Sequence, residues 1–239
     1  RILGMVMTLL VSLVCSPYAD AQNALIIWDV NDSNTQALAT ALTNAGITVT
    51  MSATNEIGYD GTNPSPAGFD AIIHLNGTTY NTEMASAGQA ALVAYVQNGG
   101  GFIHGEWNAY EILNSRMLAM RELTLFDRSY GLGGPLTYNV VPAQSGHPVV
   151  ANVPASFTFQ GAWNVGLIHS FVTDPVTVLM TDNGGNDAVA VRQYGAGRIV
   201  GFNHAGNYAA SDNTLSNSNI QQLYIDAVKW AAGTGSTTT

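Results

Sequence analysis

The sequence has a single cysteine among 239 residues, Cys15, near its start. The remaining residues therefore provide no thiol for a cysteine nucleophile, a disulfide within the domain or a thiolate metal site. Charged residues make up only 10% of the chain, and Lys229 is the only lysine. Seven Lys and Arg against sixteen Asp and Glu give a net charge of −9. Because phosphate backbones and anionic membranes are bound by clustered cations, we expect neither as a partner.

Several motifs of well-known enzyme classes are also missing. The chain has no G-x-S-x-G nucleophile elbow, which disfavours an ordinary α/β-hydrolase. It has no GxxxxGK[ST] phosphate loop, and no GxGxxG opens the first crossover. Neither an HExxH motif nor a tight histidine cluster supports a metal, so we expect no cofactor and keep a divalent ion as a secondary alternative.

Residues 1–21 have the pattern of a secretory signal peptide. A basic first residue precedes an apolar run over residues 5–14, and the small-x-small pattern Ala-Asp-Ala follows at 19–21. We expect cleavage after Ala21 and a secreted, periplasmic or cell-surface location. A membrane anchor is the alternative, but the run is shorter than the roughly 20 apolar residues that span a bilayer.

The pattern over residues 22–233 is typical of one α/β domain, and residues 234–239 form a small polar tail or the start of a linker. Helical spacing is predicted over 33–45 and 83–97. These helices alternate with continuous apolar runs that indicate buried strands: ALIIWDV, ITVTMSA, FDAIIHL and GGGFIHG. Strands buried on both faces that alternate with helices predict a mostly parallel sheet. We therefore expect a Rossmann-like or flavodoxin-like three-layer sandwich.

The second half of the domain has shorter strand-like segments and one last helix. The helix is predicted over 217–232, and GAG at 195–197 is predicted to be a hairpin turn. The strand-like segments are LTYNVV, SFTFQ, VTVLMT, DAVAVRQY and RIVGFNH. Because no repeat or domain boundary separates them from the first half, we expect them to extend the same sheet.

Polar residues directly follow several of the predicted strands. Ligands of open parallel sheets bind beyond the carboxyl ends of the strands, so this edge is the candidate site. The segments concerned are 29–32, 74–79, 104–108 and 203–208. The predicted ligand-binding residues at this edge are Asp29, Asn31, Asn76, Trp107, Asn108, Asn203 and Tyr208.

Glu106, His104 and His204 are the candidate catalytic residues. Glu106 follows a strand and precedes a helix, where a carboxylate can act as a general base, a nucleophile or a metal ligand. The alternative is that Glu106 only stabilises the first helical turn. His104 and His204 end strands and would move protons with Glu106, or hold a metal with it. His74 and His169 are expected to be hydrogen-bonded core histidines.

Five aromatic residues have two interpretations. They are Trp28, Trp107, Tyr110, Trp163 and Tyr208. Aromatic side chains at a strand edge form platforms for sugar rings, but they are also common core residues. The sequence leaves both interpretations open.

Four segments resemble the ThuA-like (trehalose utilisation) branch of the class I glutamine amidotransferase-like superfamily. They are ALIIWDVND, GGGFIHGEWNAYEIL, SGHPVVANVPASF and QYGAGRIVGFNHAGN, in that order along the chain. The resemblance implies a flavodoxin-like fold with an active-site elbow after GFIHG. Glutaminases carry a cysteine in that elbow, and this chain has His104-Gly105-Glu106 there, so glutamine hydrolysis is not implied. His204 and His104 match histidines of the branch, and Glu106 has no assured counterpart.

The resemblance associates the chain with sugar catabolism. The leading hypothesis is a secreted domain that binds or processes a carbohydrate-type ligand, with Glu106 as base, His204 as its acid/base partner, and His104 and Asn108 orienting the ligand. The alternative is a non-catalytic module for adhesion or self-assembly in a longer exported protein. A hydrolase with a Ser or Asp nucleophile has no motif behind it.

Overall fold

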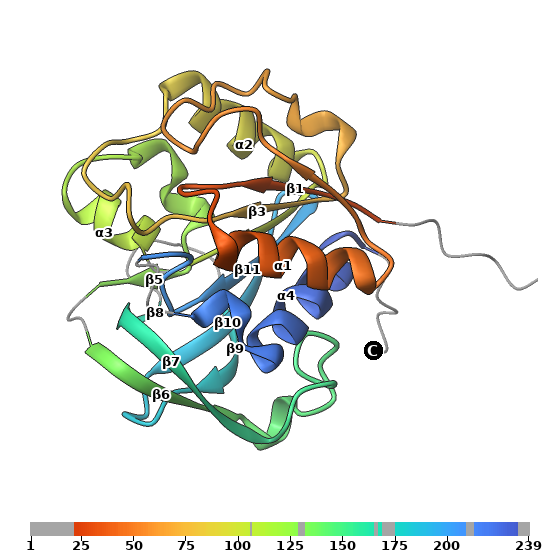
Figure 1. Cartoon of the computed structure of the whole chain (residues 1–239), viewed down its shortest axis with the longest axis vertical. Coiled ribbons are helices and arrows are strands. Elements are labelled where there is room, and N and C mark those ends of the chain that lie inside the picture. The colour runs from red at the N-terminus through yellow and green to blue at the C-terminus, as the bar shows by residue number, and fades with distance from the viewer. Residues whose placement is uncertain are drawn as a thin grey trace, which may run out of the picture.

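The computed structural model describes residues 22–105, 107–128, 132–164, 167–168, 175–208 and 213–233. Its centre is a nine-stranded sheet with the order β2-β1-β3-β4-β11-β10-β9-β6-β7 (Figure 1). The first five strands of this order pair in parallel: β2 Thr48–Met51, β1 Asn23–Ile27, β3 Ala71–His74, β4 Gly101–His104 and β11 Gly197–Phe202. The others continue it in antiparallel pairs: β10 Asp187–Tyr194, β9 Thr177–Thr181, β6 Leu132–Val140 and β7 Ser156–Asn164. The predicted flavodoxin-like fold, with extra strands from the second half of the chain, is confirmed.

Helices cover both faces of the sheet. Helices α1 (Ser33–Asn44) and α4 (Ser218–Ala231) contribute to one hydrophobic core, together with the inward side chains of β6 and β7. Helix α2 (Ser86–Gln97) and the 3-10 helix η2 (Leu118–Leu123) contribute to the core on the other face. The short helix α3 (Trp107–Leu113) lies at the end of the sheet where the parallel strands finish (Figure 1).

Local sequence signals explain where the helices begin and end. The Asp32 carboxylate accepts hydrogen bonds from the amides of Asn34 and Thr35, which caps α1, and Gly46 follows this helix with a φ of 85°. Helix α2 begins at Ser86, three residues after the predicted start. The prediction began too early because Met84 fits the apolar spacing of the helix. Met84 is indeed buried in the core, but its backbone lies before α2.

Several shorter elements complete the fold. The hairpin turn predicted at 195–197 is confirmed, since Tyr194 pairs with Gly197 and Gly195 has a φ of 59°. The sequence analysis did not predict the remaining short elements. They are a two-stranded sheet of β5 (Phe126–Asp127) and β8 (Leu167–Ile168), and the 3-10 helices η1 (Pro66–Gly68), η3 (Pro142–Gln144) and η4 (Thr214–Ser216).

The predicted signal peptide and tail, residues 1–21 and 234–239, lie outside the described residues. Within the part of the chain that the structure describes, no helix has the length and apolar character needed to cross a membrane.

Candidate functional site

Loops that follow β3, β4 and β11 are packed together at the carboxyl edge of the sheet. A Cβ atom on Gly105 would lie 2.8 Å from the carbonyl oxygen of His204, and one on Gly77 would lie 2.7 Å from the Asn207 backbone. A Cβ atom on Gly206 would lie 3.0 Å from the amide nitrogen of Asn76. Since these three glycines let the backbones approach so closely, the loops form one rigid unit.

The side chain of Asn207 connects this unit to the loop after β1. Its amide group donates to the Val30 carbonyl at 3.3 Å, to the Asp32 carboxylate at 3.1 Å and to the Thr35 hydroxyl at 3.1 Å. The Asn207 carbonyl accepts from the backbone amide of Thr78 at 3.2 Å. The carboxyl ends of β1, β3, β4 and β11 are thus held in one arrangement, as the topology predicts.

Four aromatic rings gather at this edge. Trp107 stacks on Tyr208 with ring centroids 4.8 Å apart and planes within 3°. Tyr80 and Tyr110 contact the indole at 5.1 and 5.0 Å, and the Arg128 guanidinium carbon lies 4.3 Å from its centroid. Trp107 is 4% exposed, while the three tyrosines are partly exposed. We call Tyr80, Trp107, Tyr110 and Tyr208 the aromatic cluster.

This arrangement contains three of the five aromatic residues that the sequence analysis singled out. Trp28 is elsewhere: it packs against the core under α1 and α4, and its indole donates to the Ser52 carbonyl at 2.8 Å. The side chain of Trp163 lies outside what the structure describes. Tyr80 had been missed, because it comes six residues after the end of β3 and the predicted edge segment stopped at Thr79.

Buried polar atoms without partners lie beside the aromatic cluster. Both polar side-chain atoms of Asn108, the indole nitrogen of Trp107 and the carbonyl oxygen of the Asn76 side chain have no hydrogen-bond partner among the described residues. Asn76 and Asn108 are each 1% exposed. A buried polar group that is left unpaired costs about 1–3 kcal/mol, so each of these atoms calls for a partner, which an ordered water or a bound ligand can supply.

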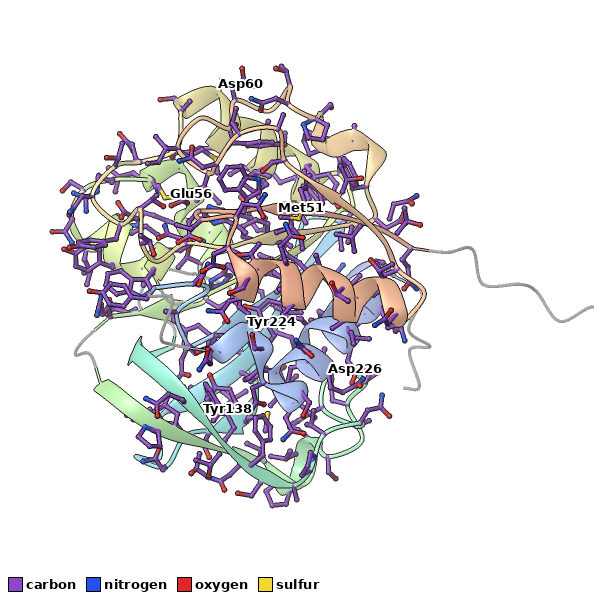
Figure 2. The ribbon with its side chains drawn as sticks, viewed as in Figure 1. Met51, Glu56, Asp60, Tyr138, Tyr224 and Asp226 are labelled. Carbon is purple, nitrogen blue, oxygen red and sulfur yellow. The ribbon has the colours of Figure 1, made fainter. Side chains whose placement is uncertain are left out.

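Two buried carboxylates lie next to this region. Asp29, at the end of β1, accepts hydrogen bonds from the amides of Val30 and Thr78 at 2.7 and 2.8 Å. Burial, with the nearby charge of Glu56 as a second cause, raises the pKa of Asp29 to about 7. Glu56, labelled in Figure 2, is the second. It accepts from His74 at 2.7 Å and from the Thr79 hydroxyl. Glu56 had been missed because it follows β2, whose edge was not considered.

A third carboxylate, also missed, lies in α3. Glu111 is fully buried, pairs with Arg116 through one oxygen, and has no described partner for the other. Burial raises the pKa of Glu111 to about 7. A carboxyl group with such a pKa is partly protonated near neutral pH, so Asp29 and Glu111 can each donate as well as accept a hydrogen bond.

His204 lies in a buried aromatic box rather than at the open edge. Its two ring nitrogens contact the hydroxyls of Tyr138 and Tyr224 at 3.0 and 3.2 Å, and the ring stacks on Phe202 at 5.0 Å. Tyr138 and Tyr224, both labelled in Figure 2, come from β6 and α4. Burial lowers the pKa of His204 to about 3, so the ring is neutral at physiological pH.

His104 is on the opposite face of the sheet, against Phe102 and Phe126. Its Nδ1 bonds to the Gly105 carbonyl at 2.8 Å and its Nε2 accepts from the Leu125 amide at 3.0 Å. Burial lowers its pKa to about 4. The two histidines therefore do not converge, and a proton-transfer role would require each ring to give up internal hydrogen bonds and become charged in the core.

The other predicted residues are distributed as follows. Asn203 is buried in the network around His204, where it accepts from the Tyr138 hydroxyl at 2.6 Å and donates to Asp182 at 3.2 Å. Asn31 is exposed and its side chain accepts from Gln36. Glu106 and His169 lie outside the described residues. Of the seven predicted ligand-binding residues, Trp107 and Tyr208 belong to the aromatic cluster, and Asp29, Asn76 and Asn108 lie at the same carboxyl edge.

Metal coordination has no structural support in the described part of the chain. No group of three or more His, Cys, Asp or Glu residues there has an arrangement that could hold an ion. The chemistry available at the edge is stacking on aromatic faces and hydrogen bonding to carboxamides and carboxyl groups.

Comparisons with known proteins show the fold. No protein-family model matches the chain, and no curated protein matches its sequence. A protein from Bacteroides uniformis described as ThuA-like has a TM-score of 0.59 at 18% identity, over 91% of this chain and 94% of that one. A GMP synthase component from Thermoplasma acidophilum has a TM-score of 0.59 at 9% identity, over 90% of this chain and 96% of that one.

An exo-β-1,4-mannosidase from Opitutaceae bacterium strain TAV5 is similar over a smaller part of its length. Its TM-score is 0.53 at 15% identity, and the alignment covers 88% of this chain but 36% of the mannosidase. The resemblance to ThuA-like and class I glutamine amidotransferase-like proteins is thus confirmed at the level of the fold.

Proposed function

We propose that this domain binds a carbohydrate or a related polyhydroxylated ligand at the carboxyl edge of its sheet. The observation that carries the proposal is the aromatic cluster next to the unpaired polar atoms of Trp107 and Asn108. Sugar rings present apolar faces that stack on aromatic side chains, and hydroxyl groups that both donate to and accept from carboxamides. The likeness to part of a mannosidase supports the same ligand class.

The proposal is one of binding, with no catalytic role assigned to His104 or His204. Both rings are neutral, fully buried and bonded within the protein. It also excludes glutamine hydrolysis through a thioester, because Cys15 is the only cysteine and lies in the predicted signal peptide. Export from the cell is part of the proposal and rests on the pattern of residues 1–21 alone.

Substitution of the unpaired polar groups provides the test. Asn108→Ala and Trp107→Phe remove buried polar atoms that have no described partner, so we expect the thermal midpoint to stay unchanged or to rise. Each variant loses hydrogen bonds to the ligand, and we expect binding about tenfold weaker. Calorimetric titration with β-1,4-mannobiose and a panel of neutral disaccharides measures the affinity.

Asn114→Ala is the matched control, since Asn114 is exposed just after α3 and donates to the Tyr110 carbonyl at 2.8 Å. It should keep full affinity. The proposal is wrong if no saccharide of the panel binds the wild-type protein, or if Asn108→Ala binds as tightly as the control.

A further inference from the structure

A groove lies at the opposite edge of the sheet, where β11 begins. Its volume is about 450 Å³, within the range of small-molecule sites. Its lining includes Gln144, the last residue of η3, and His147, together with Arg192 and Gln193 in β10, Arg198 in β11 and Trp230 in α4. No Asp or Glu lines the groove among the described residues.

Arg198 supplies positive charge to this groove. One of its terminal nitrogens donates to the Trp230 carbonyl at 2.7 Å, and its guanidinium carbon lies 5.3 Å from the centroid of the indole. Arg116 and Arg192 pair with carboxylates, but Arg198 has no carboxylate within ion-pair distance in the part of the chain that the structure describes. A guanidinium has five N–H donors, so most of those on Arg198 are still available.

His147 adds a neutral donor. Its Nδ1 accepts from the Val149 amide at 3.3 Å, which places the ring proton on Nε2. Burial lowers the pKa of His147, so the ring is uncharged at neutral pH. The imidazole contacts Trp230 with ring centroids 5.3 Å apart, so His147 and Arg198 both pack on the same indole.

We propose that this groove is a second binding site, which takes a small oxyanion such as a carboxylate or a phosphate. Arg198 holds the anion by charge-assisted hydrogen bonds, and the Nε2–H group of His147 supplies a further donor. Trp230 forms the wall against which both side chains are fixed. The site is separate from the carboxyl edge and does not depend on the function proposed there.

The experiment measures anion binding to the purified protein at constant ionic strength. Inorganic phosphate and citrate are titrated in parallel against chloride, and the ligand-dependent rise of the thermal midpoint gives the affinity. We expect phosphate, citrate or both to bind. The anion with the higher affinity shows whether the site prefers a phosphate or a carboxylate. Arg198→Gln should weaken binding at least about tenfold, and His147→Ala by a smaller factor.

Lys229→Gln is the matched control. It removes the same charge next to Trp230 from an exposed residue that does not line the groove. Because Arg198 also donates to the Trp230 carbonyl in the last turn of α4, we expect Arg198→Gln to have a lower thermal midpoint even without anion. Only loss of the anion site would also remove the rise of the thermal midpoint with anion concentration. Equal anion-dependent shifts in Arg198→Gln and Lys229→Gln, or no shift in the wild-type protein, would overturn the proposal.

Discussion

Gly105→Ala should lower the free energy of unfolding by about 3 kcal/mol and disrupt the aromatic cluster, because it forces two backbones apart. A Cβ atom at this position would lie 2.8 Å from the His204 oxygen and 2.9 Å from the Gly206 nitrogen, closer than real Cβ contacts. Gly105 joins β4 to the segment that leads into α3, so relief of this clash displaces Trp107 relative to Tyr208. Urea denaturation measures the loss of stability, and near-ultraviolet circular dichroism reports on the stacked indole.

Gly68→Ala is the appropriate comparison. Gly68 is exposed, a Cβ atom there would meet nothing within 4 Å, and its φ is not positive. Its substitution should change stability by less than about 0.5 kcal/mol. If both alanine variants unfold at the same denaturant concentration, then the loops after β4 and β11 are not the rigid unit that the close approach implies.

The carboxyl edge could be predicted from the sequence because it depends only on topology. Apolar runs such as ALII and AIIH, buried on both faces, required a parallel sheet, and parallel strands end at one edge. Asp29, Asn76 and Trp107 were found by this reasoning. Tyr80 and Glu56 were not found, because they lie in long loops. Where such loops run depends on how they pack against the rest of the fold, and the strand pattern does not indicate this.

The histidines show a second limit of sequence reasoning. His104 is the last residue of β4, whereas His204 lies two residues after the end of β11 at Phe202, where the strand alternation no longer tells which side of the sheet a side chain occupies. In the structure Phe102 and Phe126 surround one ring, and Phe202 with two tyrosines surrounds the other. The hydroxyl partners of His204 come from β6 and α4, which are distant from it in the chain, so no local motif could indicate them.

The network around His204 also links sequence-distant parts of the fold. Asp182 accepts hydrogen bonds from the Asn186 backbone amide and the Gly184 amide, both in the turn between β9 and β10, and from the side chain of Asn203. Asn203 in turn accepts from Tyr138, which contacts His204. The antiparallel half of the sheet is therefore joined to the parallel half by a continuous chain of buried polar contacts, which is expected to specify how the two halves meet.

His204→Phe should have a lower free energy of unfolding than the wild-type protein at neutral pH, and this difference should disappear in acid. At pH 7 the phenyl ring of the variant cannot pair with the Tyr224 hydroxyl, which stays buried without this partner. An unpaired buried hydroxyl lowers the free energy of unfolding by about 1–3 kcal/mol. The folded-state pKa of His204, about 3, is far below its ordinary value of 6.5. Between these values the unfolded chain binds a proton that the native protein does not, so the contribution of His204 is complete above pH 6.5 and is lost as the pH falls. The loss is about 1.4 kcal/mol per pH unit.

The difference in unfolding free energy between wild type and His204→Phe should therefore shrink from pH 6.5 downward and vanish or reverse near pH 4. Denaturant unfolding at a series of pH values measures this difference. Asp29 and Glu111 have raised pKa values and therefore make both proteins more stable as the pH falls, opposite to the effect of His204. Subtraction of the two curves removes this shared contribution. Tyr138→Phe is the control, because it removes a hydroxyl from the same box but leaves the imidazole in place, and its difference from wild type should stay nearly constant with pH. A difference for His204→Phe that is equally constant would mean that His204 is protonated in the native protein in this range, and that the buried neutral ring is not its solution state.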